Sequence, residues 1–181
     1  MNARNLILSE RQLVECCIQG QKDMQEHLYT KYKSKMFSVC QLYASNRSDA
    51  EDMLQEGFLR VFANLSQFRF EGSFEGWMRR IFVATSIDAL RKKKMRKSLP
   101  LLEVQVSDYH LDGFERLHLS DMIRLIQSLP DKYRIVFNLF EMEGYSHKEI
   151  SEFLEIPEGT SKSQLARAKD KLKKSMGLLQ E

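Results

Sequence analysis

Apolar residues recur at the spacing of an α-helix along residues 48–65, which restricts this stretch to a helix with one buried side. The apolar positions are Leu54, Phe58, Val61, Phe62 and Leu65. Three carboxylates, Asp49, Asp52 and Glu56, fall roughly opposite them. Ser48 followed by Glu51 has the pattern of a capping box, which predicts that the helix starts at Ser48. The stretch therefore predicts a helix that packs on one side and presents an acidic face on the other.

A second helix is predicted over residues 73–97, and its composition changes along its length. Its first part is apolar on two sides, so we expect it to contact other elements on both. One side holds Phe74, Trp77, Ile81 and Ala84, and the other holds Val83, Ile87 and Leu90. The helix ends in the run RKKKMRK at residues 91–97, six cations in seven residues. Cations at this density repel one another and indicate a surface that binds a polyanion.

Helical spacing continues through the rest of the chain, with one interruption. Helices are expected over residues 10–19 and 22–43 before the acidic helix, and over residues 114–128, 131–143, 146–154 and 158–176 after the basic run. Residues 98–115 contain no Lys or Arg and show no helical period in their apolar part, which indicates an extended acidic linker. The predicted fold class is all-α, with small helical domains at residues 1–97 and 116–181 joined by the linker at residues 98–115.

Composition is that of a globular protein, with 43% hydrophobic and 29% charged residues and a net charge of +3. Because the chain has no secretory h-region and no apolar run long enough to span a membrane, we expect it to be cytoplasmic. Cys16, Cys17 and Cys40 follow neither a zinc spacing nor a disulfide framework. We interpret them as reduced, packed thiols, with a redox role as the alternative.

No arrangement in the sequence predicts catalysis, a metal site or a cofactor. The histidines are scattered, and no nucleophile, base and orienting group occur as a set. Asp49, Asp52 and Glu56 would spread metal ligands along about 10 Å of helix, at roughly 1.5 Å per residue. We therefore interpret these carboxylates as an exposed face, or as acids that are favoured near a helix N-terminus.

Residues 146–174 have the pattern of a helix-turn-helix unit. Ser146 with Glu149 is a second capping box that opens a short helix, and residues 155–157 form a tight turn before a longer one. The exposed face of the longer helix carries residue types that read base edges or bind phosphates: Thr160, Lys162, Ser163, Gln164, Arg167 and Lys171. This composition predicts binding to duplex DNA, and the alternative is an ordinary charged surface helix.

The aromatic residues of the 73–97 helix indicate a second nucleic-acid contact. Trp77 and Phe74 precede the basic run on the same helix, and aromatic rings beside cations are suited to stacking on unpaired bases. Packing in the core is the alternative for both residues.

These stretches together resemble the extracytoplasmic-function group of bacterial RNA polymerase sigma factors. The run DAEDMLQE at residues 49–56, with residues 58–62, is similar to the core-binding helix of that family. The promoter-melting helix is matched by Phe74, Trp77, Arg80, Asp88 and Arg91. The second conserved domain is matched at Leu129, Pro130, Tyr133, Arg134, Phe140, Glu149, Ile150, Ile156, Pro157 and at residues 144–146 and 159–163. The resemblance covers almost the whole chain in the right order.

The resemblance implies an alternative sigma factor that binds core RNA polymerase and directs promoter-specific transcription initiation. The implied core-binding residues, which dock on the clamp helices of the largest polymerase subunit, are Asp49, Asp52, Gln55, Glu56 and Phe58. The implied contacts to the minus-ten element are Phe74, Trp77, Arg80, Arg91, Lys92 and Arg96, and the six residues of the recognition helix would contact the minus-thirty-five element. Further implied partners are the polymerase flap, promoter DNA and an anti-sigma factor. No enzymatic activity, cofactor, metal or small-molecule substrate is implied.

Three positions depart from the pattern of that family. Ala84 stands where Asn is frequent in the melting helix, Ser161 where an apolar anchor is usual, and Gln164 where Arg is common. Because Gln and Arg favour different bases, the resemblance leaves the minus-thirty-five sequence open.

Two other functions fit parts of the sequence. A conventional helix-turn-helix regulator would bind closed duplex without polymerase, and it would leave the acidic face and the aromatic-basic helix without a role. A protein-interaction adaptor or RNA binder would leave the helix-turn-helix unit unexplained.

Overall fold

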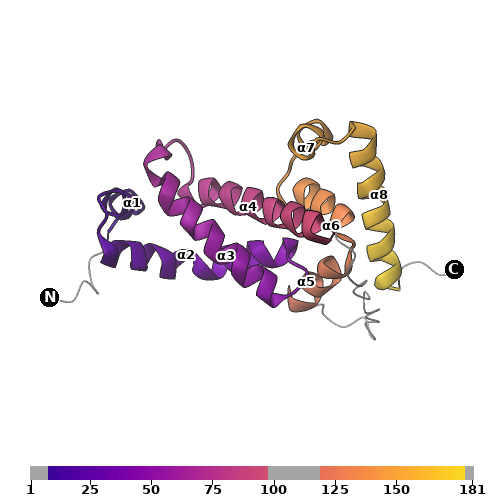
Figure 1. The fold of residues 1–181 in the computed structure, drawn as a ribbon, viewed down its shortest axis with the longest axis horizontal. Helices are drawn as coiled ribbons and strands as arrows, with labels where there is room; N and C mark the ends of the chain where they lie inside the picture. Colours follow the sequence, from indigo (N-terminus) through magenta and orange to yellow (C-terminus); the bar gives the residue numbers. More distant parts are fainter. Residues whose placement is uncertain (1–7, 98–118, 178–181) are drawn as a thin grey trace. The chain divides into compact units, whose positions relative to one another are not determined.

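Helices follow one another through short turns in the computed structural model, which describes residues 8–97 and 119–177 (Figure 1). The first stretch contains α1 (Glu10–Ile18), α2 (Lys22–Tyr43), α3 (Arg47–Asn64), the 3₁₀ turn η1 (Leu65–Gln67) and α4 (Phe74–Lys97). The second contains α5 (Leu119–Ser128), α6 (Asp131–Phe137), the π-helical turn η2 (Asn138–Met142), α7 (His147–Leu154) and α8 (Glu158–Ser175). Neither stretch contains a strand, and the all-α fold class is confirmed. The predicted linker at residues 98–115 lies outside the described residues.

Contacts divide the chain into two units. The first comprises Met1–Cys40 and Arg47–Ala89, and the second comprises Gln41–Asn46 and Leu90–Glu181. The end of α2 and the last turns of α4 thus belong to the second unit. The domain boundaries expected from the sequence stay a prediction.

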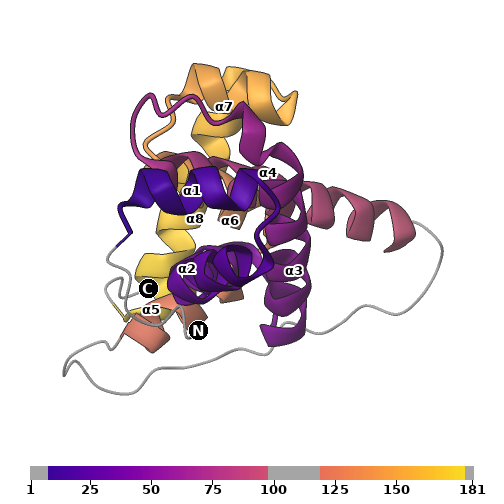
Figure 2. The ribbon, with the colours of Figure 1, turned by 90° about the vertical axis from the view of Figure 1, so that its left-hand side faces the viewer.

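In the first unit, α1 crosses the start of α2 at a steep angle. Figure 1 shows α1 end-on and α2 in the plane of the page, and Figure 2 shows the reverse. The start of α1 is fixed by a capping box, in which Gln12 N–H donates to Ser9 Oγ at 3.2 Å and Ser9 N–H donates to Gln12 Oε1 at 2.9 Å. The start expected for the helix over residues 10–19 is confirmed.

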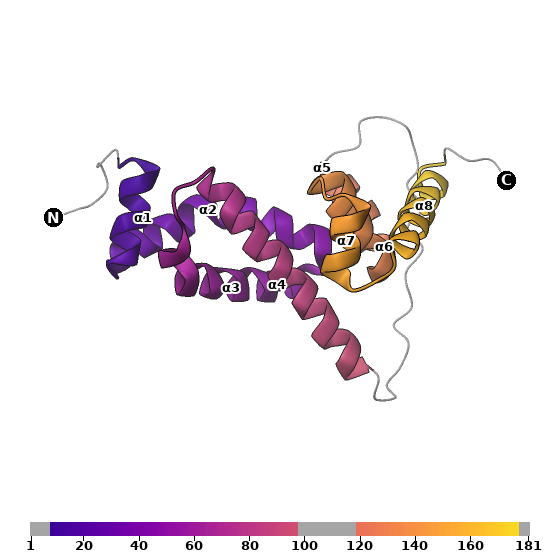
Figure 3. The same ribbon diagram turned by 90° about the horizontal axis from the view of Figure 1, so that it is seen from above.

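The core of the first unit is an aromatic cluster where α2, α3 and α4 meet. The rings of Tyr29 and Phe58 lie 4.6 Å apart, those of Phe58 and Phe82 5.2 Å, and those of Tyr32 and Phe74 5.7 Å. Figure 3 shows α4 crossing α3 obliquely. Because tilted and edge-to-face aromatic pairs are favourable at these distances, the cluster ties the three helices together.

The capping box predicted at Ser48 is wrong. Helix α3 begins at Arg47, one residue earlier, so Ser48 lies inside the first turn. The Glu51 carboxylate, which was expected to accept from the Ser48 backbone, instead accepts a hydrogen bond from Arg47 Nε at 2.8 Å. Glu51 thus forms an exposed ion pair with the residue four positions earlier on the helix.

Gly57 is required where α3 approaches α4. A Cβ atom at this position would lie 2.2 Å from Cε1 of Phe82, whose ring is fully buried. We expect Gly57→Ala to lower the free energy of unfolding by about 1 kcal/mol, because overpacking costs about 1–3 kcal/mol and outweighs a gain of about 1 kcal/mol in helix propensity. Urea unfolding measures the difference.

Gly159→Ala is the matched control for Gly57→Ala. Gly159 also lies in a helix, but a Cβ there meets no atom within 4 Å. This variant should therefore be neutral or slightly more stable than the parent. Equal urea midpoints for the two variants would show that the approach of α3 and α4 does not depend on glycine.

In the second unit, α6 packs on α8. Leu129, Tyr133 and Ala168 form a buried cluster, with Phe137 and Leu172 packed against it. The single helix predicted over residues 131–143 is corrected, because α6 ends at Phe137 and the chain continues as the π-helical turn η2. Its wider turn is closed by Glu143 N–H, which donates to Asn138 O at 3.0 Å. Asn138 is itself fixed, since its Nδ2 donates to Leu42 O at 2.6 Å.

A buried arginine joins the elements around the start of α6. Arg134 is 1% exposed. Its guanidinium donates to three carbonyl oxygens, those of Tyr43 at 3.1 Å, Gln127 at 2.8 Å and Leu129 at 3.1 Å. It also donates to Ser45 Oγ at 3.1 Å and to Asp131 Oδ1 at 2.6 Å. These acceptors come from the end of α2, the end of α5 and the start of α6. Carbonyls at helix ends lack partners within their helix, and this side chain supplies them with donors.

Candidate functional site

One face of α3 is polar and exposed, and it carries a leucine. Asp52, Gln55 and Glu56 are exposed, and the Leu59 side chain is 66% exposed. At 3.6 residues per turn these four positions span about 100° of the helix surface, with Leu59 near the middle. Asp49, one turn before Asp52, is half-buried. The acidic face predicted from the sequence thus exists, and it has an apolar centre that sequence reasoning missed.

Phe58, which the resemblance placed among the core-binding residues, does not lie on this exposed face, and that prediction is corrected. Phe58 is 3% exposed, and its ring packs on Tyr29, Phe62 and Phe82. Its side chain belongs to the core because the face of α3 toward α2 and α4 passes through Phe58, whereas Leu59 is turned away. The apolar spacing had already placed Phe58 on the buried side of the helix, and only the resemblance assigned it to core binding.

Arg60 connects the acidic face of α3 to α4. Its Nε donates to Glu56 at 3.0 Å, and its Nη1 donates to Asp88 at 2.7 Å. Hydrogen bonding to Asp88 holds the pKa of Arg60 above its ordinary value. The partner of Asp88 comes from α3, because Asp88 lies on the side of α4 that α3 approaches.

Trp77 lies half-exposed on α4, and two aromatic rings pack against its ring. Its ring centroid is 5.4 Å from that of Phe68 and 5.7 Å from that of Phe74. Arg80, one turn further on, is exposed. Phe74 is 0% exposed, so its predicted contact to DNA is corrected to a role in the core. The buried side of α4 passes through Phe74, Met78 and Phe82, and the sequence had assigned neither Met78 nor Phe82 to it.

The turn before α4 is held in an unusual backbone conformation. Phe70 has a φ of 59°, which side chains of this size rarely adopt. The guanidinium of Arg11, from α1, lies 4.7 Å from the centroid of the Phe70 ring. The centroid of the Phe68 ring lies 5.0 Å from that of Phe70. A cation–π contact and an aromatic contact thus fix the turn beside Trp77.

The predicted cations at the end of α4 are only partly described. Arg91 and Lys92 are exposed. The side chain of Arg96 lies outside the described residues.

The helix-turn-helix unit is present as expected. Ser146 Oγ accepts from Glu149 N–H at 3.3 Å, and Ser146 N–H donates to Glu149 Oε2 at 2.8 Å, which confirms the second capping box. Helix α7 ends at Leu154, and the φ of 55° at its C-cap residue, Glu155, turns the chain toward α8. Figures 1 and 2 show α7 and α8 crossing steeply. Among the described residues, this arrangement leaves one long face of α8 exposed, opposite buried Leu165 and Ala168.

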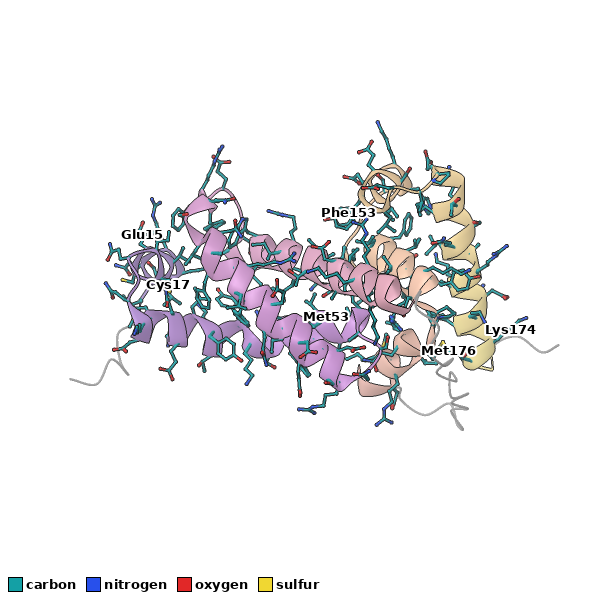
Figure 4. All side chains as sticks on the ribbon, in the orientation of Figure 1. Glu15, Cys17, Met53, Phe153, Lys174 and Met176 are labelled. Carbon is teal, nitrogen blue, oxygen red and sulfur yellow. The ribbon has the colours of Figure 1, made fainter. Side chains whose placement is uncertain are left out.

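The open face of α8 carries the polar residues predicted from the sequence. Lys162, Ser163, Arg167 and Lys171 are exposed, and Thr160 and Gln164 are half-exposed. Charged side chains continue to the last turn, where Figure 4 labels Lys174. All six predicted recognition residues therefore lie together on one helix.

Three of these side chains already have partners. Ser163 Oγ donates to the Thr160 carbonyl oxygen at 3.0 Å. Lys162 pairs with Glu158 at 2.8 Å, an exposed pair that contributes at most about 1 kcal/mol. Hydrogen bonding from Arg167 lowers the pKa of Tyr133, a residue of the α6–α8 core cluster. Arg167 thus links the exposed face of α8 to the core beneath it.

The cysteines have the properties of packed thiols. Burial raises the pKa of Cys17 to about 11, with a further contribution from Cys16, and burial raises the pKa of Cys40 to about 12. Because the thiolate is the reactive form, both residues are poor nucleophiles at neutral pH. Within residues 8–97 and 119–177, no group of three or more His, Cys, Asp or Glu is placed to hold a metal ion. No helix in the same ranges is long and apolar enough to cross a membrane.

Known proteins resemble this chain over nearly its full length. Residues 28–96 match the family model of Sigma-70 region 2, and residues 119–172 match that of Sigma-70 region 4. The ECF RNA polymerase sigma factor SigW of Bacillus subtilis is 34% identical over 170 residues, which cover 87% of this chain and 91% of SigW. This chain belongs to the ECF sigma factors.

More distant members of the family agree. The ECF RNA polymerase sigma factor SigM of Mycobacterium tuberculosis is 27% identical over 172 residues, 94% of this chain and 86% of SigM. Among solved structures, the sigma factor RpoE of Bartonella quintana, in complex with the anti-sigma factor NepR, aligns with a TM-score of 0.56 at 18% identity. The alignment covers 86% of this chain and 98% of RpoE, and it shows a shared fold.

The chain is therefore an alternative sigma factor, which binds core RNA polymerase and promoter DNA and directs promoter-specific transcription initiation. Sigma factors are transcription initiation factors and not enzymes. The region 2 match contains the α3 face and Trp77, and the region 4 match contains residues 146–172 of the helix-turn-helix unit. The family predicted from the sequence is confirmed.

Proposed function

We propose that this sigma factor uses three separate surfaces, one to bind core polymerase and two to bind promoter DNA. The face of α3 formed by Asp52, Gln55, Glu56 and Leu59 binds core polymerase, the Trp77 side of α4 holds the melted minus-ten strand, and the open face of α8 reads the minus-thirty-five element. The first two belong to a domain at residues 1–97 and the third to a domain at residues 116–181, with a linker at residues 98–115 between them. The chain acts where the polymerase is, in the cytoplasm, and catalyses no reaction of its own.

The observation that carries the proposal is the exposed leucine among carboxylates on α3. The Leu59 side chain, at the centre of Asp52, Gln55 and Glu56, is 66% exposed and therefore buries little apolar surface against the described residues. Such a patch fits a partner that offers cations around an apolar spot, because interfaces combine a desolvated apolar centre with a polar rim. The resemblance to the family's core-binding helix supports the clamp helices of the largest subunit as that partner. Asp49 extends the rim by one turn.

Trp77 is suited to stack on an unpaired base. The ring is supported by Phe68 and Phe74 on its inner side, and it leaves an outer part open beside exposed Arg80. A ring that is already fixed loses little conformational freedom when a base stacks on it. Arg91, Lys92 and Arg96 would add attraction for phosphates along the same helix.

On α8 the exposed residues divide into two roles. Thr160, Ser163, Gln164 and Arg167 have side chains that hydrogen-bond to base edges in the major groove. Lys162 and Lys171 bind phosphates and set the register of the helix. An anti-sigma factor is a further partner that we propose, supported by the solved sigma factor RpoE, which has a similar fold and is in complex with NepR. The polymerase flap is the proposed partner of the second domain.

Transcription from a panel of genomic promoters, with bacterial core polymerase in the presence and absence of the protein, tests the function. New transcripts that require both components are expected, and their start sites would define both promoter elements. If transcription is unchanged, while the protein alone shifts duplex DNA with a steep salt dependence, the chain acts as a conventional regulator.

Trp77→Ala is expected to reduce open-complex formation about tenfold, because stacking on a base contributes about 1–3 kcal/mol. Binding to the closed promoter should change less than about twofold, since no base is unpaired at that stage. Fluorescence of 2-aminopurine in the minus-ten element reports opening, and a gel shift at low temperature reports closed-complex binding. Trp77→Phe, which keeps an aromatic ring, is the control and should retain most activity. Equal losses in both assays would contradict a role in melting.

A further inference from the structure

The recognition helix is joined to α7 by a hydrogen bond between two side chains. Ser161, in the first turn of α8, is fully buried, and its Oγ lies 2.9 Å from Nδ1 of His147, the first residue of α7. The distance suits a hydrogen bond whichever atom carries the proton. A family position where an apolar anchor is usual is thus filled here by a polar residue with a directional partner.

His147 is itself fixed by the π-helical turn. Its ring stacks on Phe140 of η2, with centroids 4.6 Å apart and the planes inclined by 26°. Lys169 of α8 lies 5.9 Å from the centroid of Phe140, and its Nζ pairs with Glu141 at 2.7 Å. Because π-helical turns widen the helix and redirect its side chains, η2 brings Phe140 to the imidazole. Three elements, η2, α7 and α8, therefore meet at one polar contact.

The contact between His147 and Ser161 lies next to the side chains of α8 that we propose to bind DNA. Ser161 lies between Thr160 and Lys162 and one turn before Gln164, so any rotation of this turn moves all three. An apolar contact fills space over a range of angles, whereas a hydrogen bond favours a narrow range of distance and direction. Small displacements of recognition side chains alter the energy of contacts that depend on geometry.

We propose that His147 and Ser161 form a polar latch that sets the angle of α8 on α7 and thereby selects the minus-thirty-five sequence. Neither residue contacts DNA in this scheme, and both are positioning residues. The proposal rests on the recognition role proposed above for α8, and it adds which side chains orient that helix.

The test measures base preference with holoenzyme made from the full chain and core polymerase. Duplex promoters with a randomised minus-thirty-five element are selected by binding, and the preference at each position is read by sequencing. Ser161→Ala removes the hydroxyl, and His147→Phe keeps a ring against Phe140 but removes Nδ1. Each is expected to reduce the preference for the best base by about three- to fivefold at the same positions, because one hydrogen bond contributes about a factor of five.

A rescuing variant separates the latch from general packing. His147→Asn keeps a polar atom at the place of Nδ1 without the ring, so it should retain the parental preference. The double variant Ser161→Ala with His147→Phe should be no worse than either single variant, because both changes break the same contact. Affinity for core polymerase and for single-stranded minus-ten DNA should not change in any variant.

The outcomes distinguish the two proposals. Unaltered preferences in Ser161→Ala and His147→Phe, additive effects in the double variant, or failure of His147→Asn to retain the preference would each overturn the latch while leaving recognition by α8 intact. A parental holoenzyme without any preference in the randomised element would overturn recognition by α8, and the latch with it.

Discussion

Replacing Asp52 and Glu56 together by lysine is expected to weaken binding to core polymerase at least about 100-fold. Truncating or reversing charged partners at an interface costs about 2–5 kcal/mol, and a factor of 100 corresponds to about 2.7 kcal/mol. The fold should survive, because both side chains are exposed and the pair between Glu56 and Arg60 is a surface contact. Arg60 also keeps its second partner, Asp88, at 2.7 Å. Fluorescence anisotropy of labelled protein titrated with core polymerase measures the affinity.

The control for this double variant is Asp23→Lys with Glu26→Lys. It makes the same change in net charge on exposed residues of α2, in the same unit. Its affinity should stay within about threefold of the parent, since charges far from an interface act mainly through screened long-range attraction. Comparable losses in both double variants would assign the effect to net charge and remove α3 as the docking face.

Leu59→Ala separates the apolar part of this face from its charges. It should weaken core binding without changing its salt dependence, whereas the lysine variant should change the salt dependence as well. This difference follows from the exposed position of Leu59 at the centre of the face.

Arg134→Met is expected to lower the free energy of unfolding of the second unit by at least about 3 kcal/mol. Methionine fills much of the buried volume but donates no hydrogen bond. The carbonyl oxygens of Tyr43, Gln127 and Leu129 then lose a charged donor inside the protein, and each unsatisfied acceptor costs about 1–3 kcal/mol. Loss of a buried charged group with several partners belongs to the largest single-residue effects.

Two probes distinguish the units during urea unfolding. Trp77, the only tryptophan, reports the first unit by fluorescence, and circular dichroism at 222 nm reports all helices. In Arg134→Met, part of the dichroism should be lost at lower urea while the fluorescence midpoint stays in place. Arg124→Met makes the same chemical change on α5 at a side chain that is 73% exposed, and it should be nearly neutral. Identical unfolding of the two variants would contradict the role of Arg134.

Helix type and order follow from the sequence because their causes are local. Apolar spacing of three and four residues identified the helices, and the capping chemistry of Ser9 and of Ser146 with Glu149 fixed two starts. The face of α8 was predictable for the same reason, since residues 160–171 lie on one helix and their relative directions depend only on its geometry. The failed cap at Ser48 shows the limit, because Arg47 competes for Glu51 at equally short range.

The interior of the first unit was decided by tertiary structure. Phe74 and Met78 are buried and Trp77 is half-exposed, although all three are apolar. Which residue faces inward on a helix that is apolar on two sides depends on where neighbouring helices cross it, and α3 and α4 cross near Gly57. The pair of Arg60 with Asp88 is likewise a contact between helices.

The sequence by itself determined an all-helical fold with an acidic helix, an aromatic-basic helix and a helix-turn-helix unit, because periodicity and capping are properties of short segments. The order of its motifs carried the resemblance to ECF sigma factors. The tertiary structure alone decided which side chains remain available to partners, and it placed His147, Phe140 and Ser161 in contact across the π-helical turn. Burial and pairing between segments distant in sequence arise only when the helices pack, so no local pattern encodes them.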